Sequence, residues 1–214
     1  NDLIKVKGLS AKTVRNTHGV LHKALVKAME LHYISHNPSD ACSLPHVERK
    51  MICPLEQTDI KAFLKQIELE DRYKNLYMVT LFTGVRLGEI CGLPWDSIDF
   101  NRGTICIHQQ LSKEKKKGGK YYIATTKNNK SRTITPAPFV MAVLKEVRRT
   151  QAENRIKAGK AWKDEWDLVF TDELGKHMAP QTVWKQFKKV VKSIGKPETR
   201  FHDLRHTYAV TALQ

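Results

Sequence analysis

Two charged side chains that could hold a phosphate stand close together in the segment TGVRLGEICGLPWDSIDF, Thr83–Phe100. Arg86 follows a glycine-containing turn and Glu89 comes three residues later, which would place both on one face of a helix. A guanidinium group stays charged at any useful pH and can donate two parallel hydrogen bonds to a phosphodiester. The segment therefore predicts an anion-binding arginine. The simpler alternative is an exposed Arg–Glu pair at the head of a helix.

A second charged pair occurs in FHDLRHTYAV, Phe201–Val210, where His202 and Arg205 are three residues apart. Near the N-terminus of a helix both would face one side, and there the helix dipole favours an anion. The imidazole could carry a proton near neutral pH, and the arginine could add a second positive charge. His206 lies four residues after His202, but no acidic or cysteine ligand accompanies the two histidines. We therefore expect no metal and no other cofactor.

A lysine lies between these two segments, in TTKNNKSRTI. Lys127 falls at the turn of a predicted β-hairpin, where a flexible ammonium group could reach a leaving oxygen. Taken alone, a lysine in a polar turn is more often a solvated turn residue. The flanking motifs are what make it a candidate.

The order of these residues, T-G-x-R-x-x-E, then a hairpin lysine, then H-x-x-R, resembles the tyrosine recombinase family, also called the phage integrases. The residues that fit the two family motifs are Thr83, Gly84, Arg86, Glu89, Leu93, Trp95, Ile98, Asp99 and the run from His202 to Tyr208. The resemblance implies site-specific DNA recombination, as in the integrases of temperate phages and conjugative transposons. A type IB topoisomerase and a non-catalytic basic DNA-binding module are the alternatives.

The resemblance also implies a mechanism. A tyrosine attacks the scissile phosphodiester, which leaves a 3′-phosphotyrosyl enzyme and a free 5′-hydroxyl that later attacks a partner strand. Arg86 and Arg205 would hold the non-bridging oxygens and stabilise the transition state. Lys127 would protonate the 5′ leaving oxygen, and His202 would assist proton transfer or hold the phosphate. Glu89 would support the site by orienting Arg86 or His202. No metal takes part in this mechanism.

The family continues past the H-x-x-R motif to the nucleophilic tyrosine, whereas this sequence ends at Gln214. Tyr208 stands where the family has an aromatic core residue, so we expect it to pack within the helix bundle rather than to attack DNA. By itself this chain is therefore expected to be inactive in cleavage and monomeric without DNA. The intact protein is expected to act as a homotetramer on the double-stranded DNA of attachment sites.

Mainly helical elements are predicted to position these side chains. Helices are expected from Ser10 towards Asn37, over 57–67, 73–82, 137–157 and 180–194, and from about Phe201. Between Thr104 and Thr135, three β-branched and aromatic runs predict a small antiparallel sheet, with KEKKKGGK as a basic loop between two strands. The fold class is therefore mainly α with a small antiparallel β-sheet (α+β), as in a tyrosine recombinase catalytic domain.

A linker is predicted in SLPHVERKMICPLEQ, which carries two prolines and little periodicity. We place the domain boundary there. Residues 1–47 resemble the C-terminal part of a helical core-binding domain that contacts DNA, and residues 48–214 resemble the catalytic domain, truncated before the nucleophilic tyrosine.

The net charge of +15, from 37 Lys and Arg against 22 Asp and Glu, indicates a polyanionic partner. No apolar run is long enough to cross a bilayer, so duplex DNA is favoured over a membrane surface. The four cysteines form no C-x-x-C pair, which is typical of a reducing cytoplasm, and we expect the protein to associate with the nucleoid there. The basic residues expected to bind DNA are Lys12, Arg15, Lys23, Lys113, Lys115, Lys116, Lys117, Lys120, Lys130 and Arg132.

Overall fold

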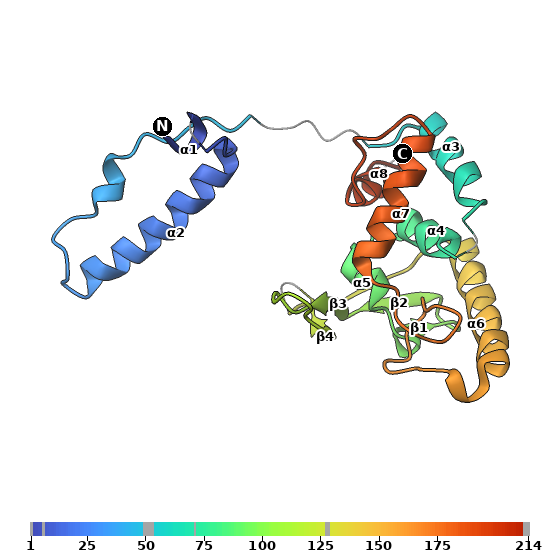
Figure 1. Ribbon diagram of the computed structural model, residues 1–214. Helices are drawn as coiled ribbons and strands as arrows, with labels where there is room; N and C mark the ends of the chain where they lie inside the picture. The colour runs from blue at the N-terminus through green and yellow to red at the C-terminus, as the bar shows by residue number, and fades with distance from the viewer. Residues whose placement is uncertain (1, 6, 49–53, 71, 127–128, 212–214) are drawn as a thin grey trace. The chain divides into compact units, whose positions relative to one another are not determined.

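The computed structural model describes residues 2–5, 7–48, 54–70, 72–126 and 129–211. The chain divides into two compact units, Asn1–Met51 and Ile52–Gln214, which are drawn in Figure 1. In the described part of the chain, no helix has the length and the apolar character needed to cross a membrane.

The first unit is built around one long helix. It contains α1 (Asp2–Lys5), α2 (Ala11–Glu30) and the 3-10 turn η1 (Pro38–Ala41). Ser10 caps α2, because its hydroxyl accepts a hydrogen bond from the backbone amide of Thr13 at 3.1 Å. The expectation that α2 continues to Asn37 was wrong. The helix ends at Glu30, and His32 has a φ of 58°, a left-handed conformation that a right-handed helix cannot include.

The turn η1 is held against α2 by polar contacts. In α2, Nε2 of His18 lies 3.0 Å from the carbonyl oxygen of Ser39, and Nδ1 of His22 lies 3.1 Å from the Ser39 hydroxyl. Asn37 adds a contact of 2.9 Å to His22. No residue of α2 is buried within the described structure.

The second unit carries the remaining elements. Its helices are α3 (Gln57–Ile67), α4 (Lys74–Thr83), α5 (Leu87–Cys91), α6 (Pro138–Ala158), α7 (Pro180–Ser193) and α8 (Asp203–Thr211), with 3-10 turns η2 (Trp95–Ser97) and η3 (Gly159–Ala161). Its strands are β1 (Ile98–Asp99), β2 (Thr104–Ile107), β3 (Gln109–Lys113), β4 (Tyr121–Thr125) and β5 (Arg132–Ile134). The helices predicted in this part of the sequence are confirmed to within about two residues at each end, a scatter that is ordinary for helix boundaries.

The strands form two small antiparallel sheets instead of the single predicted one. The first has the order β1-β2-β5, and the second pairs β3 with β4. The run TICIHQQL is interrupted at His108, after which the chain changes its pairing partner. The strands on either side of Lys127 are β4 and β5, and they lie in different sheets, so the hairpin predicted around that lysine was wrong. The basic loop KEKKKGGK does join two paired strands, β3 and β4.

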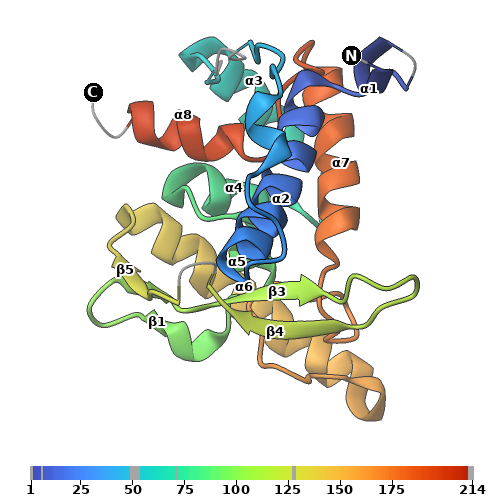
Figure 2. The same ribbon diagram turned by 90° about the vertical axis from the view of Figure 1, so that its left-hand side faces the viewer.

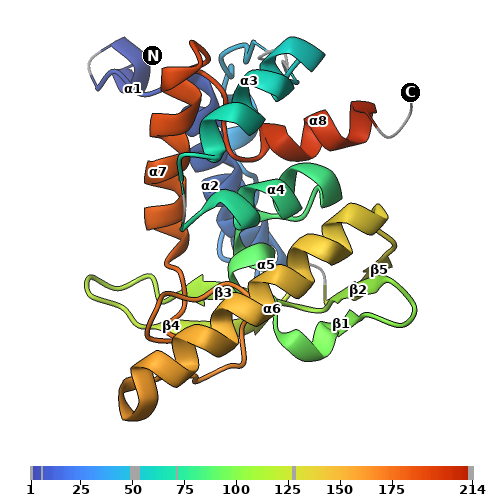
Figure 3. The ribbon, with the colours of Figure 1, turned by 90° about the vertical axis from the view of Figure 1, so that its right-hand side faces the viewer.

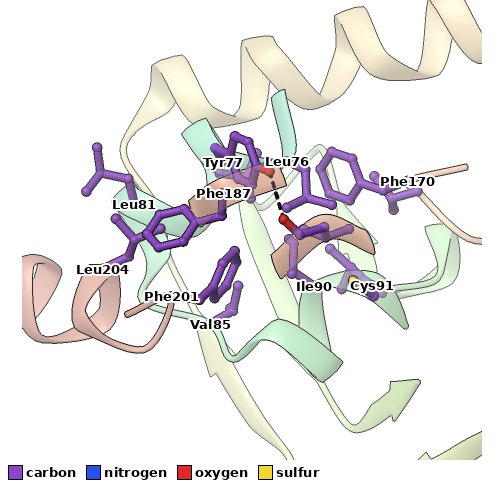
Figure 4. Packing of buried hydrophobic residues seen from close by; sticks show 14 of the residues in the cluster. Leu76, Tyr77, Leu81, Val85, Ile90, Cys91, Phe170, Phe187, Phe201 and Leu204 are labelled. Carbon is purple, nitrogen blue, oxygen red and sulfur yellow. Dashed lines mark hydrogen bonds between the residues drawn. The ribbon is translucent and has the colours of Figure 1, made fainter. Parts of the chain in front are cut away.

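An aromatic cluster forms the centre of the second unit, as Figure 4 shows. Phe63, Tyr77, Phe187 and Phe201 come from α3, α4, α7 and the turn before α8, with neighbouring ring centroids 5.2 to 6.3 Å apart. The Tyr77 hydroxyl donates to the carbonyl oxygen of Val183 at 2.9 Å, and burial raises the pKa of this hydroxyl. Because Phe201 is part of this cluster, the start of α8 is anchored to the core.

The strands lie at one end of the helical body of this unit, away from α3 and α8, and the views in Figures 2 and 3 agree on this. The long α6 runs beside α4, where Phe82 and Phe139 meet edge to face at 4.8 Å. Helix α5 lies between the helices and the β3–β4 hairpin. A Cβ at Gly92 would be 2.3 Å from the backbone nitrogen of Leu111, so glycine is required for this close approach.

Candidate anion-binding site

The turn between α4 and α5 brings Arg86 to the start of a helix. Gly84 ends α4 in a left-handed conformation, with a φ of 62°, and its amide donates to the carbonyl oxygen of Thr80 at 2.9 Å. Arg86 then occupies the N-cap position of α5 in an extended conformation. Its side chain is 41% exposed. The predicted break at Thr83–Gly84 is thereby confirmed, and it presents the arginine at the surface.

Glu89 is a buried carboxylate that receives four hydrogen bonds. Its side chain is 1% exposed. The Arg86 backbone amide and Nη1 donate to it at 2.9 and 2.8 Å, and Nη1 and Nη2 of Arg132 donate at 3.0 and 2.5 Å. Burial alone would raise the pKa of Glu89, but the hydrogen bonds from Arg132 and Arg86 outweigh it and lower this pKa to about 2. The group is therefore an anion at neutral pH.

Arg205 brings a third guanidinium group to the same place. It projects from the first turn of α8, and its Nη1 donates to the carbonyl oxygen of Gly84 at 2.6 Å. The hydrogen bond ties Arg205 to the turn that carries Arg86, two residues after Gly84. Burial and the positive charges of Arg86 and Arg132 lower the pKa of Arg205. Three positive charges face the single negative charge of Glu89. The cluster of Arg86, Arg132 and Arg205 therefore has an excess of positive charge that a phosphate group could neutralise.

His202 lies at the edge of this arginine cluster. It lies directly before Asp203, the first residue of α8, and so stands at the start of the helix as predicted, to within the ordinary scatter of helix boundaries. Its side chain is exposed. Partial burial and the positive charges of His206, Arg205 and Arg86 lower the pKa of His202. Its imidazole is therefore mainly neutral at neutral pH and able to accept a proton. The rings of His202 and His206 meet edge to face at 5.0 Å. Among the described residues, no group of three potential metal ligands occurs.

Tyr208 packs against the turn that carries Arg86. A Cβ added to Gly84 would lie 2.6 Å from Cδ1 of Tyr208, so the ring rests directly on the glycine. The same glycine accepts the hydrogen bond from Arg205 through its carbonyl oxygen. Gly84 thus joins α4 to α8 by two contacts. The expected packing of Tyr208 against a neighbouring helix is confirmed, whereas the expectation that it does not attack DNA stays a prediction.

Lys127 lies outside the described residues, so its position relative to the arginine cluster stays a prediction. The residues beside it are ordered by local hydrogen bonds. The Thr126 hydroxyl donates to the Lys130 carbonyl oxygen at 2.7 Å, and the Thr125 hydroxyl donates to Asn129 at 2.6 Å. The side chain of Lys130 is exposed, as a DNA contact would require.

The other basic residues predicted to bind DNA form two exposed groups, and one residue, Arg132, differs from both. Lys113, Lys115, Lys116, Lys117 and Lys120 are exposed on or beside the β3–β4 hairpin loop, and Lys12, Arg15 and Lys23 are exposed on α2 in the first unit. Arg132 is the exception, because both ends of its guanidinium group are bound to Glu89. No motif in the sequence indicated this contact. Glu89 and Arg132 are 43 residues apart, and no local spacing rule connects them.

A second contact that the sequence did not reveal fixes α8 at its other side. The hydroxyl of Thr207, which is buried, accepts a hydrogen bond from the backbone amide of Leu55 at 2.9 Å. Thr207 follows Arg205 by two residues, so this bond helps to hold the helix that carries the arginine. Leu55 lies near the start of the second unit, 152 residues earlier in the chain, which no sequence pattern could indicate.

Comparisons with known proteins agree on one family. Residues 54–214 match the model of the phage integrase family. The chain is 29% identical to a "Tyrosine recombinase XerC-like" protein of Caldanaerobacter subterraneus subsp. tengcongensis, over 95% of the chain and 56% of the relative. It is 24% identical to an integrase of Saccharopolyspora erythraea, over 96% of the chain and 58% of the relative. The chain thus spans little more than half the length of these curated relatives.

A solved structure with a similar fold is that of the Tn1549 transposon integrase in complex with transposon right end DNA. The TM-score is 0.82 with 25% sequence identity, over 97% of this chain and 68% of the other. A lambda integrase tetramer bound to a Holliday junction matches with a TM-score of 0.65 and 16% identity, which shows a shared fold.

Proposed function

The chain belongs to the phage integrase family, and on this premise we propose that its second unit grips the scissile phosphodiester during site-specific DNA recombination. The observation that carries the proposal is the excess positive charge of the arginine cluster, where Arg86 and Arg132 bind the carboxylate of Glu89 and Arg205 binds the backbone of the turn that carries Arg86. Such a cluster suits a phosphate whose negative charge grows in the transition state. The DNA-bound integrase with the similar fold supports this proposal.

In the proposed reaction, Arg86 and Arg205 bind the non-bridging oxygens of the phosphate. In the described structure Arg86 uses Nη1 for Glu89, and with 41% of its side chain exposed it can turn its remaining donors towards a ligand. Arg205 is held by the Gly84 carbonyl oxygen in the same way. Each arginine therefore has one hydrogen bond that fixes its position and further donors for the phosphate.

The proton transfers are assigned to Lys127 and His202. A tyrosine hydroxyl of the intact protein attacks phosphorus, the bond from phosphorus to the 5′ oxygen breaks, and Lys127 gives its proton to that leaving oxygen. His202 either accepts a proton, for which its lowered pKa keeps the imidazole mainly neutral beforehand, or donates a hydrogen bond to a phosphate oxygen. The reverse sequence, with a new 5′-hydroxyl as the nucleophile, joins the strands and releases the tyrosine.

The first unit and the hairpin loop are proposed to extend the contact with duplex DNA. On this proposal residues 1–47 are part of a core-binding domain and residues 48–214 belong to the catalytic domain. The exposed lysines of α2 and of the β3–β4 loop neutralise other phosphates of the same duplex. The intact protein works as a tetramer on two duplexes, in the cytoplasm at the nucleoid.

The salt dependence of DNA binding should test the assignment of the hairpin loop. If about six of the predicted residues contact phosphates, log affinity falls against log salt with a slope of about −5. Replacing Lys115, Lys116 and Lys117 together by glutamine is expected to make this slope less steep by about 3. The matched control replaces Lys185, Lys189 and Lys192, which are exposed on α7, and should leave the slope unchanged. Equal effects of the two triple variants would contradict the assignment.

The proposed chemistry is tested with a nicked attachment-site duplex that traps cleaved DNA. The full-length gene product is expected to form an adduct that survives denaturant, whereas residues 1–214 alone bind the duplex without forming one. In the full-length protein, Tyr208→Phe should leave adduct formation intact, because this ring packs on Gly84. An adduct that depends on Tyr208 would show that the nucleophile was assigned wrongly. Salt-sensitive binding without any adduct would favour the non-catalytic DNA-binding module.

A further inference from the structure

Arg132 holds Glu89 with both ends of its guanidinium group. It is the first residue of β5, and its backbone pairs with Ile107 of β2. Nη1 donates to Oε1 of Glu89 at 3.0 Å and Nη2 donates to Oε2 at 2.5 Å. This is the two-pronged geometry in which the planar arginine fork fits a carboxylate, and a lysine cannot reproduce it.

The two oxygens of Glu89 are shared equally between two arginines. Each oxygen accepts one hydrogen bond from Arg132 and one from Arg86. Since the carboxylate is buried, water cannot easily replace a donor that is lost. Without Arg132, two of the four donors would be missing, and Glu89 would be free to draw Arg86 inward and away from a ligand.

Arg132 also connects two elements of the second unit, α5 and β5. Helix α5 carries Glu89, and β5 follows directly after the segment 126–131 in which Lys127 lies. The Glu89–Arg132 contact therefore joins the start of β5 to α5, the helix that begins after Arg86. The positive charge of Arg132 also helps to lower the pKa of Arg205.

We propose that Arg132 is a positioning residue for strand cleavage, which acts through Glu89 to aim Arg86 at the phosphate instead of binding DNA itself. The inference rests on the proposed function and deepens it, because it replaces the sequence-based assignment of Arg132 to DNA binding. The two roles differ in a measurable way. A positioning residue changes the rate of cleavage in the bound complex, whereas a phosphate contact changes affinity and its salt dependence.

The test measures cleavage of the nicked duplex under single-turnover conditions, with DNA affinity measured separately over a range of salt concentrations. Arg132→Gln in the full-length gene product is expected to slow cleavage by about 100-fold at saturating protein, as misplacement of a catalytic group typically does. Affinity should change by less than about threefold and the salt slope by less than one unit. Arg132→Lys should be similarly impaired, because it keeps the charge but loses the fork. Arg102→Gln, which removes an exposed arginine paired with Asp99, is the matched control and should cleave normally.

A double-variant cycle separates the two roles further. If Arg132 acts only through Glu89, the protein with both Glu89→Gln and Arg132→Gln should cleave no more slowly than the slower single variant. Multiplied effects, together with a salt slope that is less steep by about one unit in Arg132→Gln, would overturn the proposal in favour of a direct phosphate contact. Cleavage at the unmodified rate by Arg132→Gln would overturn it as well.

The stability of the protein at acid pH can be measured without cleavage. It distinguishes a failure of this inference from a failure of the proposed function. The lowered pKa of Glu89 gives a contribution to stability that is present above its ordinary value of 4.5 and is lost as the pH falls towards about 2. Removal of Arg132 should raise that pKa and move the loss to higher pH. An unchanged acid transition would show that the contact is absent. No adduct from the unmodified protein would overturn the proposed function, and the positioning role with it, even if the acid transition moved.

Discussion

Replacement of Arg205 by alanine in the full-length gene product is expected to slow strand cleavage by about 1000-fold. The guanidinium group stabilises negative charge that develops on the phosphate, and loss of one such donor in other enzymes costs a factor of about 100 to 1000 or more. Arg205 is fixed by a hydrogen bond of 2.6 Å to Gly84, so it enters the reaction without reorganisation. The measurement is the single-turnover rate of adduct formation on a nicked duplex, at protein concentrations that saturate the DNA.

Two further variants test whether the loss is specific to the guanidinium group of Arg205. Arg205→Lys keeps the charge but not the fork, so it should recover only part of the rate. Arg149→Ala removes an arginine that is exposed on α6 and paired with Glu146 and Glu153, and it should cleave normally. If Arg205→Ala cleaved at nearly the unmodified rate, the arginine cluster would not be the phosphate site. Its excess positive charge would then no longer support the proposed function.

Replacement of Gly84 by alanine is expected to have the second large effect, on both stability and cleavage. Alanine in a left-handed conformation costs about 1 to 2 kcal/mol. Its Cβ would also lie 2.6 Å from Cδ1 of Tyr208, so the ring must move, and we expect helix α8, which carries it, to shift as well. Because Arg205 lies on this helix and binds the Gly84 carbonyl oxygen, a shift of about 1 Å should slow cleavage by about 100-fold.

A second glycine separates the two causes. Gly103 also has a left-handed conformation, with a φ of 66°, but a Cβ added there would meet nothing within 4 Å. Gly103→Ala should therefore lose stability through the backbone alone and keep the unmodified cleavage rate. Thermal unfolding and single-turnover cleavage of both variants are the measurements. Equal stabilities and equal rates for the two variants would show that the contact between Tyr208 and Gly84 does not position α8.

Local patterns in the sequence were sufficient for the helices of the second unit and for most of the candidate site. Apolar spacing predicted α3, α4, α6 and α7, because a helix that buries one face repeats its apolar residues every three or four positions. The start of α8 was expected near Phe201 from the turn before it. Arg86 with Glu89, and His202 with Arg205, were found because each pair is only three residues apart. The order of these motifs also indicated the family that the comparisons later showed.

Patterns of this kind carry no information about which strand pairs with which. The run TICIHQQL was correctly predicted to be extended, but its division at His108 into strands of two different sheets depends on contacts with β4 and β5. The hairpin expected around Lys127 was wrong for the same reason. Pairing is decided by which residues meet across the sheet, and those residues are far apart in sequence.

The sequence by itself determined that two arginines and a histidine would stand at helix starts in a strongly basic, mainly helical chain. Only the tertiary structure decided that Arg132, 43 residues from Glu89, completes the cluster, and that Gly84 lies under Tyr208 and binds Arg205. The physical reason is that local spacing fixes which face of an element a side chain occupies, whereas the distance between two elements is fixed by the packing of the whole core. The excess positive charge at the site is therefore a property of the fold.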